Sequence, residues 1–366
     1  MPELSVLIAV AQSTGGIGHH VATIARGLAR RDVAVTICAP ADTIHAMSFD
    51  ALPCRVITAP LGASDPVALH RVRKTLRAET SQVDVVHAHG LRAGADCATF
   101  GHLAPLVVTW HNAPLGGLAW RVAHGALSRY VARRADLTLA ASDDLAAAAR
   151  RFGARRVRST FVAAPVLLPP SRSAAEMRTE LGVGERPVVL AIGRLQRQKR
   201  LDVLVTAAAA WADQPDGPVV VVAGDGPDHD ALAAQIAATS APVKLIGGRG
   251  DVPELLGMAD VVALPSEWEA RSLVAREALQ AGVPLVTTGV GGLASLVGEA
   301  AEIVPVGDAE ALRASLESIL RDDAKRDRMI ALGRARARSW PDEAGSVDEL
   351  MAEYLDLIRR VRLHSE

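Results

Sequence analysis

Residues 188–199 read VVLAIGRLQRQK, and this stretch decides the fold class. The apolar run Val188–Ile192 meets Gly193 and then a polar segment that leads into a helical stretch at Leu201–Ala210. A short apolar run bounded by a turn signal is typical of a buried strand. Because runs of this kind alternate with helical stretches along the whole chain, we predict parallel β-sheets covered by helices, the α/β class.

The chain contains two sets of predicted strands. The first half offers Leu4–Val10, Val33–Cys38, Arg55–Thr58, Asp84–His87, Leu106–Trp110 and Leu137–Ala140. The second half offers Val188–Ile192, Val219–Ala223, Val243–Ile246, Val261–Leu264 and Leu285–Thr287. A proline-rich segment at 162–173 separates the two sets and has the composition of a stiff linker. We therefore expect two Rossmann-like domains, 1–165 and 174–340, that face each other across a cleft. Ligands of such sheets bind at the carboxyl ends of the strands.

Length, composition and charge exclude several classes of protein. A chain of 366 residues, 49% of them hydrophobic, is long enough for two cores. A net charge of -1 argues against nucleic acid as a partner. The three cysteines, Cys38, Cys54 and Cys97, form no CxxC pair and are typical of reduced, buried residues in a cytoplasmic protein. The run Leu4–Ala11 is too short for a signal peptide, and no apolar run has the length of a membrane span.

Gly193, Arg194 and Lys199 form a predicted anion site. They follow a strand and precede a helix, and the two cations lie five residues apart. A glycine permits close approach of the backbone, and a helix N-terminus favours negative charge. The two side chains add positive charge to this turn.

Glu269 and Glu277 are the second candidate pair, with seven residues between them. Glu269 falls in the loop after a predicted strand, and Glu277 falls in a helix that begins near Ser272 and ends at Gly282. Glu277 is three and four positions from Val274 and Leu273, on the apolar face of that helix. Because carboxylates accept hydrogen bonds from hydroxyl groups, the pair indicates a polyhydroxylated ligand. The alternative is a surface charge at Glu269 and a structural ion pair at Glu277.

Together these stretches resemble the retaining glycosyltransferases of family 4, which have the GT-B fold. The resemblance rests on a Glu-x7-Glu motif and on a Gly-Arg-x4-Lys loop. It extends to three further stretches, Gly224–Pro227, Gly248–Pro253 and Gly282–Gly292. The family's C-terminal helices cross back onto the first domain, which here implies that residues 341–366 complete domain 1–165.

The resemblance implies a role for each matching residue. Glu277 would hold the ribose of a nucleotide sugar and Glu269 the sugar hydroxyls, while Arg194 and Lys199 would stabilise the departing diphosphate. His111, after the strand Leu106–Trp110, matches the histidine that the family places beside the anomeric carbon. His87 and His89 resemble a second histidine segment of the same cleft. Further donor contacts would come from Gly15, Gly16, Gly193, Arg249, Ala270, Arg271, Ser272 and Leu273.

Two of these segments have alternative interpretations. The loop Ser13–Gly18 could be a dinucleotide site, but its spacing is not G-x-G-x-x-G and no acidic residue follows the second strand. A tight strand–helix turn is the other alternative. His87 and His89 could bind a metal ion, but no third ligand is evident from the sequence.

Asp228 and Asp230 form an Asp-x-Asp, which is the manganese site of another glycosyltransferase fold. Here they lie at a predicted helix start, where acidic residues cap the helix and favour its dipole. We therefore expect no metal site and no cofactor, because Arg194 and Lys199 supply the positive charge.

The chain departs from the family pattern at Ala270–Ser272, where members commonly have Gly-Phe-Gly, at Arg200, which replaces a frequent glycine, and in the linker 162–165. These changes leave the donor open more than the reaction. Two basic stretches, 67–77 and 120–134, alternate cationic with apolar residues. They are either solvated helix faces or contacts to an anionic membrane surface.

The predicted function is transfer of a sugar from a GDP- or UDP-linked donor to an acceptor hydroxyl, with retention. The expected setting is cell-envelope glycan, glycolipid or small-molecule glycoside synthesis, in the cytoplasm or peripherally on the inner face of the membrane. A nucleotide-sugar epimerase of the same fold and an inactive sugar-nucleotide-binding regulator are the alternatives.

Overall fold

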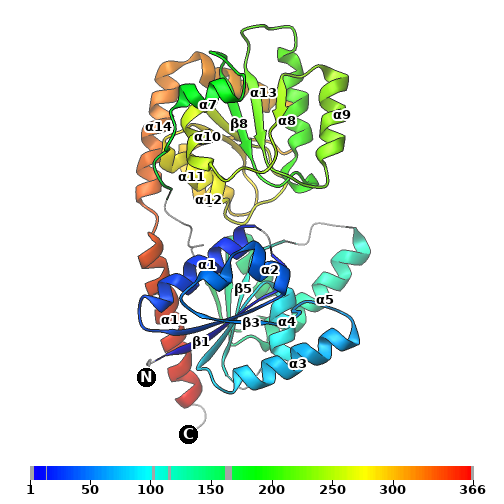
Figure 1. Ribbon diagram of the computed structural model, residues 1–366, viewed down its shortest axis with the longest axis vertical. Coiled ribbons are helices and arrows are strands. Elements are labelled where there is room, and N and C mark those ends of the chain that lie inside the picture. The colour runs from blue at the N-terminus through cyan, green and yellow to red at the C-terminus, as the bar shows by residue number, and fades with distance from the viewer. Residues whose placement is uncertain (1–3, 14, 101–103, 114–116, 161–166, 364–366) are drawn as a thin grey trace. The chain divides into compact units, whose positions relative to one another are not determined.

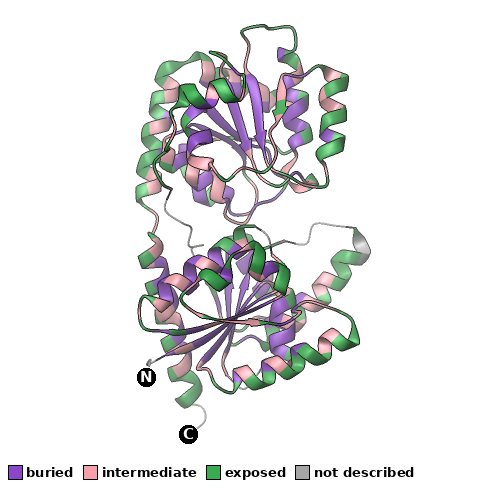
Figure 2. Ribbon diagram, in the orientation of Figure 1, coloured by how far each residue is buried: buried purple, intermediate pink, exposed green. Residues whose placement is uncertain are grey.

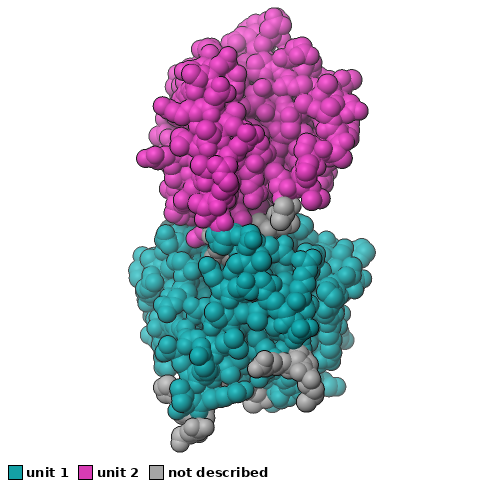
Figure 3. All heavy atoms as spheres, turned by 90° about the vertical axis from the view of Figure 1, so that its left-hand side faces the viewer, with its two compact units in different colours: residues 1–166, 341–366 teal, residues 167–340 magenta. Residues whose placement is uncertain are grey.

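The computed structural model describes the chain except residues 1–3, 14, 101–103, 114–116, 161–166 and 364–366. The predicted linker 162–173 therefore lies partly outside the described residues. The chain divides into two compact units (Figure 3), and each has its own core. Unit 1 comprises Met1–Val166 and Pro341–Glu366, and unit 2 comprises Leu167–Trp340.

The described residues of unit 1 form a seven-stranded parallel sheet in the order β3-β2-β1-β4-β5-β6-β7 (Figure 1). Its strands are β1 Ser5–Val10, β2 Ala34–Ala39, β3 Arg55–Thr58, β4 Val85–His89, β5 Leu106–Trp110, β6 Leu137–Ala140 and β7 Val157–Ser159. In register, Ile8 of β1 lies opposite Ile37 on one side and His87 on the other. The chain order reverses between β1 and β4, which makes this pair the switch point of the sheet.

Helices cover both faces of the first sheet. They are α1 Gly16–Ala29, α2 Ala41–Ala46, α3 Pro66–Thr80, α4 Leu91–Phe100, α5 Leu118–Arg134, α6 Asp143–Arg151 and α15 Glu343–Leu363, with a short 3-10 turn at Phe49–Ala51. Val6 and Ile8 point to the face that α1 and α15 cover. The alternate residue Leu7 is buried on the opposite face, as the period of two along a strand requires. Both faces are thus apolar, as parallel sheets demand.

The last helix, α15, belongs to the core of unit 1. Val347, Leu350, Tyr354 and Leu357 share one apolar cluster with β1 and α1. Helix α15 approaches α1 at Gly27, where an added Cβ would lie 2.5 Å from Val347. The absent side chain lets the two helices come close.

The described residues of unit 2 form a six-stranded parallel sheet in the order β10-β9-β8-β11-β12-β13. Its strands are β8 Val188–Ile192, β9 Val219–Ala223, β10 Val243–Leu245, β11 Val261–Leu264, β12 Leu285–Thr288 and β13 Glu302–Val304. Its helices are α7 Ala174–Glu180, α8 Leu201–Ala208, α9 His229–Thr239, α10 Val252–Met258, α11 Leu273–Ala281, α12 Leu293–Val297, α13 Ala309–Arg321 and α14 Asp323–Arg338. Short 3-10 turns cover Arg197–Lys199, Ala209–Trp211 and Gly298–Ala300.

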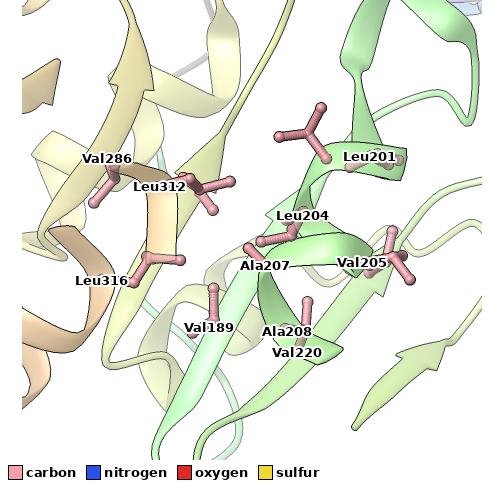
Figure 4. Packing of buried hydrophobic residues seen from close by; sticks show 14 of the residues in the cluster. Val189, Leu201, Leu204, Val205, Ala207, Ala208, Val220, Val286, Leu312 and Leu316 are labelled. Atoms are coloured by element: carbon pink, nitrogen blue, oxygen red, sulfur yellow. The ribbon is translucent and has the colours of Figure 1, made fainter. Parts of the chain in front are cut away.

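The core of unit 2 is built from β-branched strand residues and leucines of two helices. Figure 4 shows Val189 and Val220 of the sheet beside Leu204 of α8, with Leu312 and Leu316 of α13 close by. The central strands of both units are buried, whereas the edge strands and the outer helix faces are partly or largely exposed (Figure 2). In the sheet of unit 2 the chain order reverses between β8 and β11, which makes this pair its switch point.

The predicted fold class, two doubly wound α/β domains, is confirmed. Strands β7 and β13 were not predicted; each has three residues at a sheet edge, and only one of the three is buried. The basic side chains of α3 are exposed, among them Arg71 and Arg73. None of the described helices is both long enough and apolar enough to cross a lipid bilayer.

Candidate functional site

Each sheet presents its candidate residues at its own switch point. In unit 1, the loop after β1 carries Gly15, Gly16 begins α1, and the neighbouring strand β4 ends at His89. In unit 2, the loop after β8 carries Gly193, and the loop after the neighbouring β11 carries Glu269. The crevice outside the carboxyl ends of such strands is where open α/β sheets bind ligands.

An ion pair joins the two sequence motifs of unit 2. Lys199 Nζ donates to Glu269 Oε1, and the two side chains are only 18% and 10% exposed. Ser266 Oγ donates to the same carboxylate oxygen at 2.9 Å. Because both charges are largely withdrawn from water, each holds the other in place. Among the described residues both contacts are to Oε1, so the site has a fixed carboxylate whose Oε2 remains for a ligand.

Hydrogen bonds to backbone carbonyls hold the two loops of unit 2 together. Gln198 Nε2 donates to the carbonyl of Trp268 at 2.7 Å, and the amide of Glu267 donates to the carbonyl of Gln198 at 2.8 Å. The loop after β12 closes on the same segment, since the amide of Gly292 donates to the carbonyl of Glu269 at 2.9 Å. Three loops therefore determine where Glu269 lies.

Gly291 permits this closure. Its φ is +54°, and a Cβ added there would lie 1.9 Å from the carbonyl oxygen of Glu269. An L side chain is disfavoured at this φ and would collide with the backbone.

Helix α11 begins at the same place. The Ser272 hydroxyl caps it by accepting from the Ala275 amide at 3.3 Å, and Gly282 ends it at φ +77°. Ala270, Arg271 and Leu273 surround the start of this helix and are partly buried. The predicted bounds of the helix are confirmed.

Glu277 lies one turn into α11 and is half-buried. Burial raises the pKa of its carboxyl group, and the neighbouring Arg276 partly offsets this. A carboxylate that loses water in this way gains from hydroxyl donors of a ligand.

Arg194 and Arg249 differ in what they bind. Arg194 is exposed, and within the described part of the chain its guanidinium forms no ion pair. Arg249 donates to Asp251 at 2.8 Å and to Glu180 at 2.8 Å, and these bonds raise its pKa. Arg194 is thus free to meet an anion, whereas Arg249 is held by two carboxylates.

Unit 1 has a cavity of about 390 Å³ at its own switch point. Its polar lining comes from Gln12, Ser13, His89, Arg92, His111, Asn112 and His124, and its apolar lining includes Ile17, Trp120 and Leu127. Gly15 and Gly16 begin α1 between two of these lining residues and are exposed. The cavity can accommodate a molecule with both hydroxyl-bearing and apolar parts.

Three histidines meet beside this cavity. His89 Nδ1 and His111 Nε2 are 3.1 Å apart, and the ring of His20 lies 5.5 Å from each of theirs. Burial, followed by the neighbouring imidazoles, holds the pKa of His89 and of His111 well below the ordinary value. Both rings are therefore neutral near pH 7.

The comparisons with known proteins agree with this architecture. Residues 15–165 match the glycosyl transferase 4-like domain, and residues 173–336 match the glycosyl transferases group 1 model. The chain belongs to the group 1, family 4-like glycosyltransferases. The predicted family is thereby confirmed.

Relatives and solved structures cover most of this glycosyltransferase. A phosphatidyl-myo-inositol mannosyltransferase of Mycobacterium leprae is 27% identical over 89% of this chain and 89% of that protein. An N-acetyl-alpha-D-glucosaminyl L-malate synthase of Bacillus anthracis is 24% identical over 76% of this chain and 74% of its own length. The crystal structure of Anabaena Alr3699/HepE with UDP and glucose superposes with a TM-score of 0.80 at 22% identity, covering 97% of this chain and all of that one. The last comparison confirms the GT-B fold.

Two histidine predictions for this glycosyltransferase need correction. His87 does not line the cavity: its Nδ1 and Nε2 lie 2.6 Å from the hydroxyls of Tyr354 and Thr109, and burial lowers its pKa to about 3. The sequence also indicated no third metal ligand. In the structure, one ring nitrogen from each of His20, His89 and His111 lies within 4.8 Å of the other two. The sequence offered one indication of this third ligand: His20 lies four residues before Ile24, on the buried face of α1.

Asp228 and Asp230 lie at the start of α9, as predicted. Asp228 occupies the cap position, but its side chain makes no capping hydrogen bond. Asp230 lies 3.0 Å from His229 Nδ1. Neither carboxylate belongs to the histidine cluster that could hold a metal ion in the described residues.

Proposed function

We propose that this glycosyltransferase moves a sugar from a nucleotide-diphosphate donor, GDP- or UDP-linked, to an acceptor hydroxyl with retention of configuration. The observation that carries the proposal is the Lys199–Glu269 pair at the switch point of unit 2, with the exposed Arg194 in the same loop. Two cations beside a carboxylate suit a diphosphate attached to a polyol.

The proposed roles follow from where charge develops during transfer. As the bond between sugar and diphosphate breaks, negative charge grows on the leaving phosphate, and Lys199 and Arg194 stabilise it. Glu269 accepts hydrogen bonds from the sugar hydroxyls while Lys199 fixes its position. Glu277 accepts from the ribose hydroxyls, whose bonds offset its loss of water.

We place the acceptor in the cavity of unit 1, which His111 helps to line. In this scheme the acceptor oxygen attacks on the face that the diphosphate leaves. Its proton goes to an oxygen of the departing phosphate, so the scheme needs no nucleophile from the protein. It also needs no metal ion, because the cations of unit 2 meet the developing charge.

Related proteins support the donor class. A Mycobacterium tuberculosis relative, 30% identical over 52% of this chain and 52% of its own length, is described as a GDP-mannose-dependent mannosyltransferase. HepE was crystallised with UDP-glucose. These names leave both GDP and UDP as candidate nucleotides for this chain.

The assignment of the two glutamates can be tested by calorimetric titration of GDP and of UDP. Glu277→Gln should weaken the binding of the preferred nucleotide by about 1.5–3 kcal/mol, because charge-assisted bonds to the ribose are lost. Glu269→Gln should leave that affinity nearly unchanged and lower the rate of transfer.

Equal weakening in both variants, or weakening only in the Glu269 variant, would refute this division of roles. Incubation of each nucleotide sugar without an acceptor serves as the control. Conversion of the donor under that condition would identify an epimerase instead.

A further inference from the structure

The histidine cluster of unit 1 has the composition of a metal site. His20 comes from α1, His89 from the end of β4 and His111 from the residue after β5. All three side chains are buried, with exposed fractions of 3%, 2% and 7%. We infer that His20, His89 and His111 bind a Zn²⁺ ion, and that this ion inhibits sugar transfer.

The distances suit zinc after a small adjustment. Zinc binds imidazole nitrogen at about 2.0–2.1 Å in tetrahedral geometry, which sets the nitrogens roughly 3.3 Å apart. His89 Nδ1 and His111 Nε2 are already 3.1 Å apart, and all three ligand nitrogens lie within 4.8 Å of one another. Closing the remaining distance moves an imidazole by at most about 1.5 Å.

A hydrogen bond joins two of the ligand nitrogens, so a metal ion has to displace its proton. In the hydrogen-bonded pair, one proton lies between His89 Nδ1 and His111 Nε2. When zinc binds both atoms, that proton moves to the other nitrogen of its own ring, so charge and atoms balance.

The surroundings leave the fourth coordination position accessible. His89 and His111 line the cavity of unit 1, so an ion that they hold would face it. Three protein ligands and an open fourth position are typical of zinc sites that exchange a water molecule. An ion there would fix His111 and occupy the part of the cavity beside His89 and His111. The inhibition, but not the binding, rests on the function proposed above.

Adjacent histidines offer a matched pair of variants. His19 is exposed, whereas His20 is buried in the cluster. Protein freed of metal by chelator should bind one Zn²⁺ in calorimetry and give the visible absorption of tetrahedral cobalt with one equivalent of Co²⁺. His20→Gln should weaken zinc binding by at least about tenfold, and His19→Gln should not change it.

Wild-type protein without cobalt bands, or equal affinities in the two variants, would overturn the site. Circular dichroism checks that the His20 variant is folded, and the cobalt titration of the wild type decides the matter without any variant. Zinc should inhibit transfer at the concentration at which it binds, and EDTA should restore the rate. Binding without inhibition would refute the regulatory part. If no donor supports transfer, the proposed function fails while the calorimetry still decides the metal site.

Discussion

Asp96 of α4 is a buried carboxyl group that the proposed chemistry does not use. It is 8% exposed and accepts a hydrogen bond from the Gly62 amide at 2.7 Å. Burial raises its pKa from 3.8 to about 6, and the bond to Gly62 only partly offsets this. The folded state therefore binds the proton of the Asp96 carboxyl group more tightly than the unfolded state does. The protonated carboxyl contributes fully to the free energy of unfolding below about pH 4, and this contribution is lost as the pH rises from about 4 to 6.

We therefore predict that Asp96→Asn stabilises the protein near neutral pH. An amide removes the buried charge and keeps an oxygen for the Gly62 amide. A pKa difference of about two units corresponds to roughly 3 kcal/mol at most, so we expect a gain of about 1–3 kcal/mol at about pH 7.5 and almost none at about pH 4. Urea unfolding at both values measures it. If the free energies of unfolding of wild type and Asp96→Asn differed equally at the two pH values, the effect of the substitution would come from packing and not from ionisation of Asp96.

At the scale of residues, a site residue can be recognised in the sequence where a charged side chain follows the apolar run of a predicted strand. Lys199 and Glu269 could be predicted as site residues because each follows an apolar run. Their ion pair could not be predicted, because it forms only where β8 and β11 lie side by side in the sheet. His20 was missed because a histidine within an amphipathic helix gives no sign of what it faces. Arg249 matches a motif, yet its two carboxylate partners are visible only in the fold.

At the scale of elements, the loop after β12 governs where Glu269 lies. Gly291→Ala places a Cβ against the Glu269 carbonyl at a φ of +54°, so this loop must move. We expect transfer to fall by about 10–100-fold, because a displacement of about 1 Å suffices for such a loss. Binding of the nucleoside diphosphate should change little, since Glu277 lies on α11.

The control is Gly250→Ala, a position with open space around the added Cβ. Steady-state kinetics and calorimetry of both variants provide the comparison. If Gly291→Ala retained full transfer activity, or if the two alanine variants lost activity equally, the proposed support of Glu269 by this loop would be wrong.

Element boundaries were predictable where a side chain marks them. Helix α11 lies between its Ser272 cap and Gly282, and both ends agree with the prediction. Helix α8 was predicted to reach Ala210 but ends at Ala208, where the chain tightens into a 3-10 turn. Alanines favour a helix without marking its end, so that boundary depends on the packing of Trp211 in the core.

At the scale of the whole molecule, unit 1 depends on the returning helix α15. Tyr354 is fully buried, and its hydroxyl lies 2.6 Å from His87 Nδ1. Tyr354→Phe should lower the free energy of unfolding of unit 1 by about 1–3 kcal/mol, because a buried nitrogen loses its partner. Nucleoside diphosphate affinity should be unchanged, since Arg194, Lys199 and Glu277 all belong to unit 2.

The chain's other tyrosine provides the control, because Tyr130 forms an exposed hydrogen bond with Thr99 at 2.9 Å. Tyr130→Phe should change stability by less than about 0.5 kcal/mol. Denaturant unfolding and nucleotide titration of both variants test the prediction. Equal destabilisation by the two substitutions would contradict it.

Unit 1 is discontinuous in the chain, and this has a consequence for its synthesis. All seven strands of its sheet leave the ribosome before residue 167, but Leu350 and Tyr354 of its core are made only after the whole of unit 2. Until α15 is synthesised, the nascent first unit therefore has an apolar surface on α1 and β1 that α15 does not yet cover. Unit 2, which starts later, is complete sooner. Cotranslational folding usually proceeds from the amino-terminal domain onward, and here the first unit to start is the last to finish.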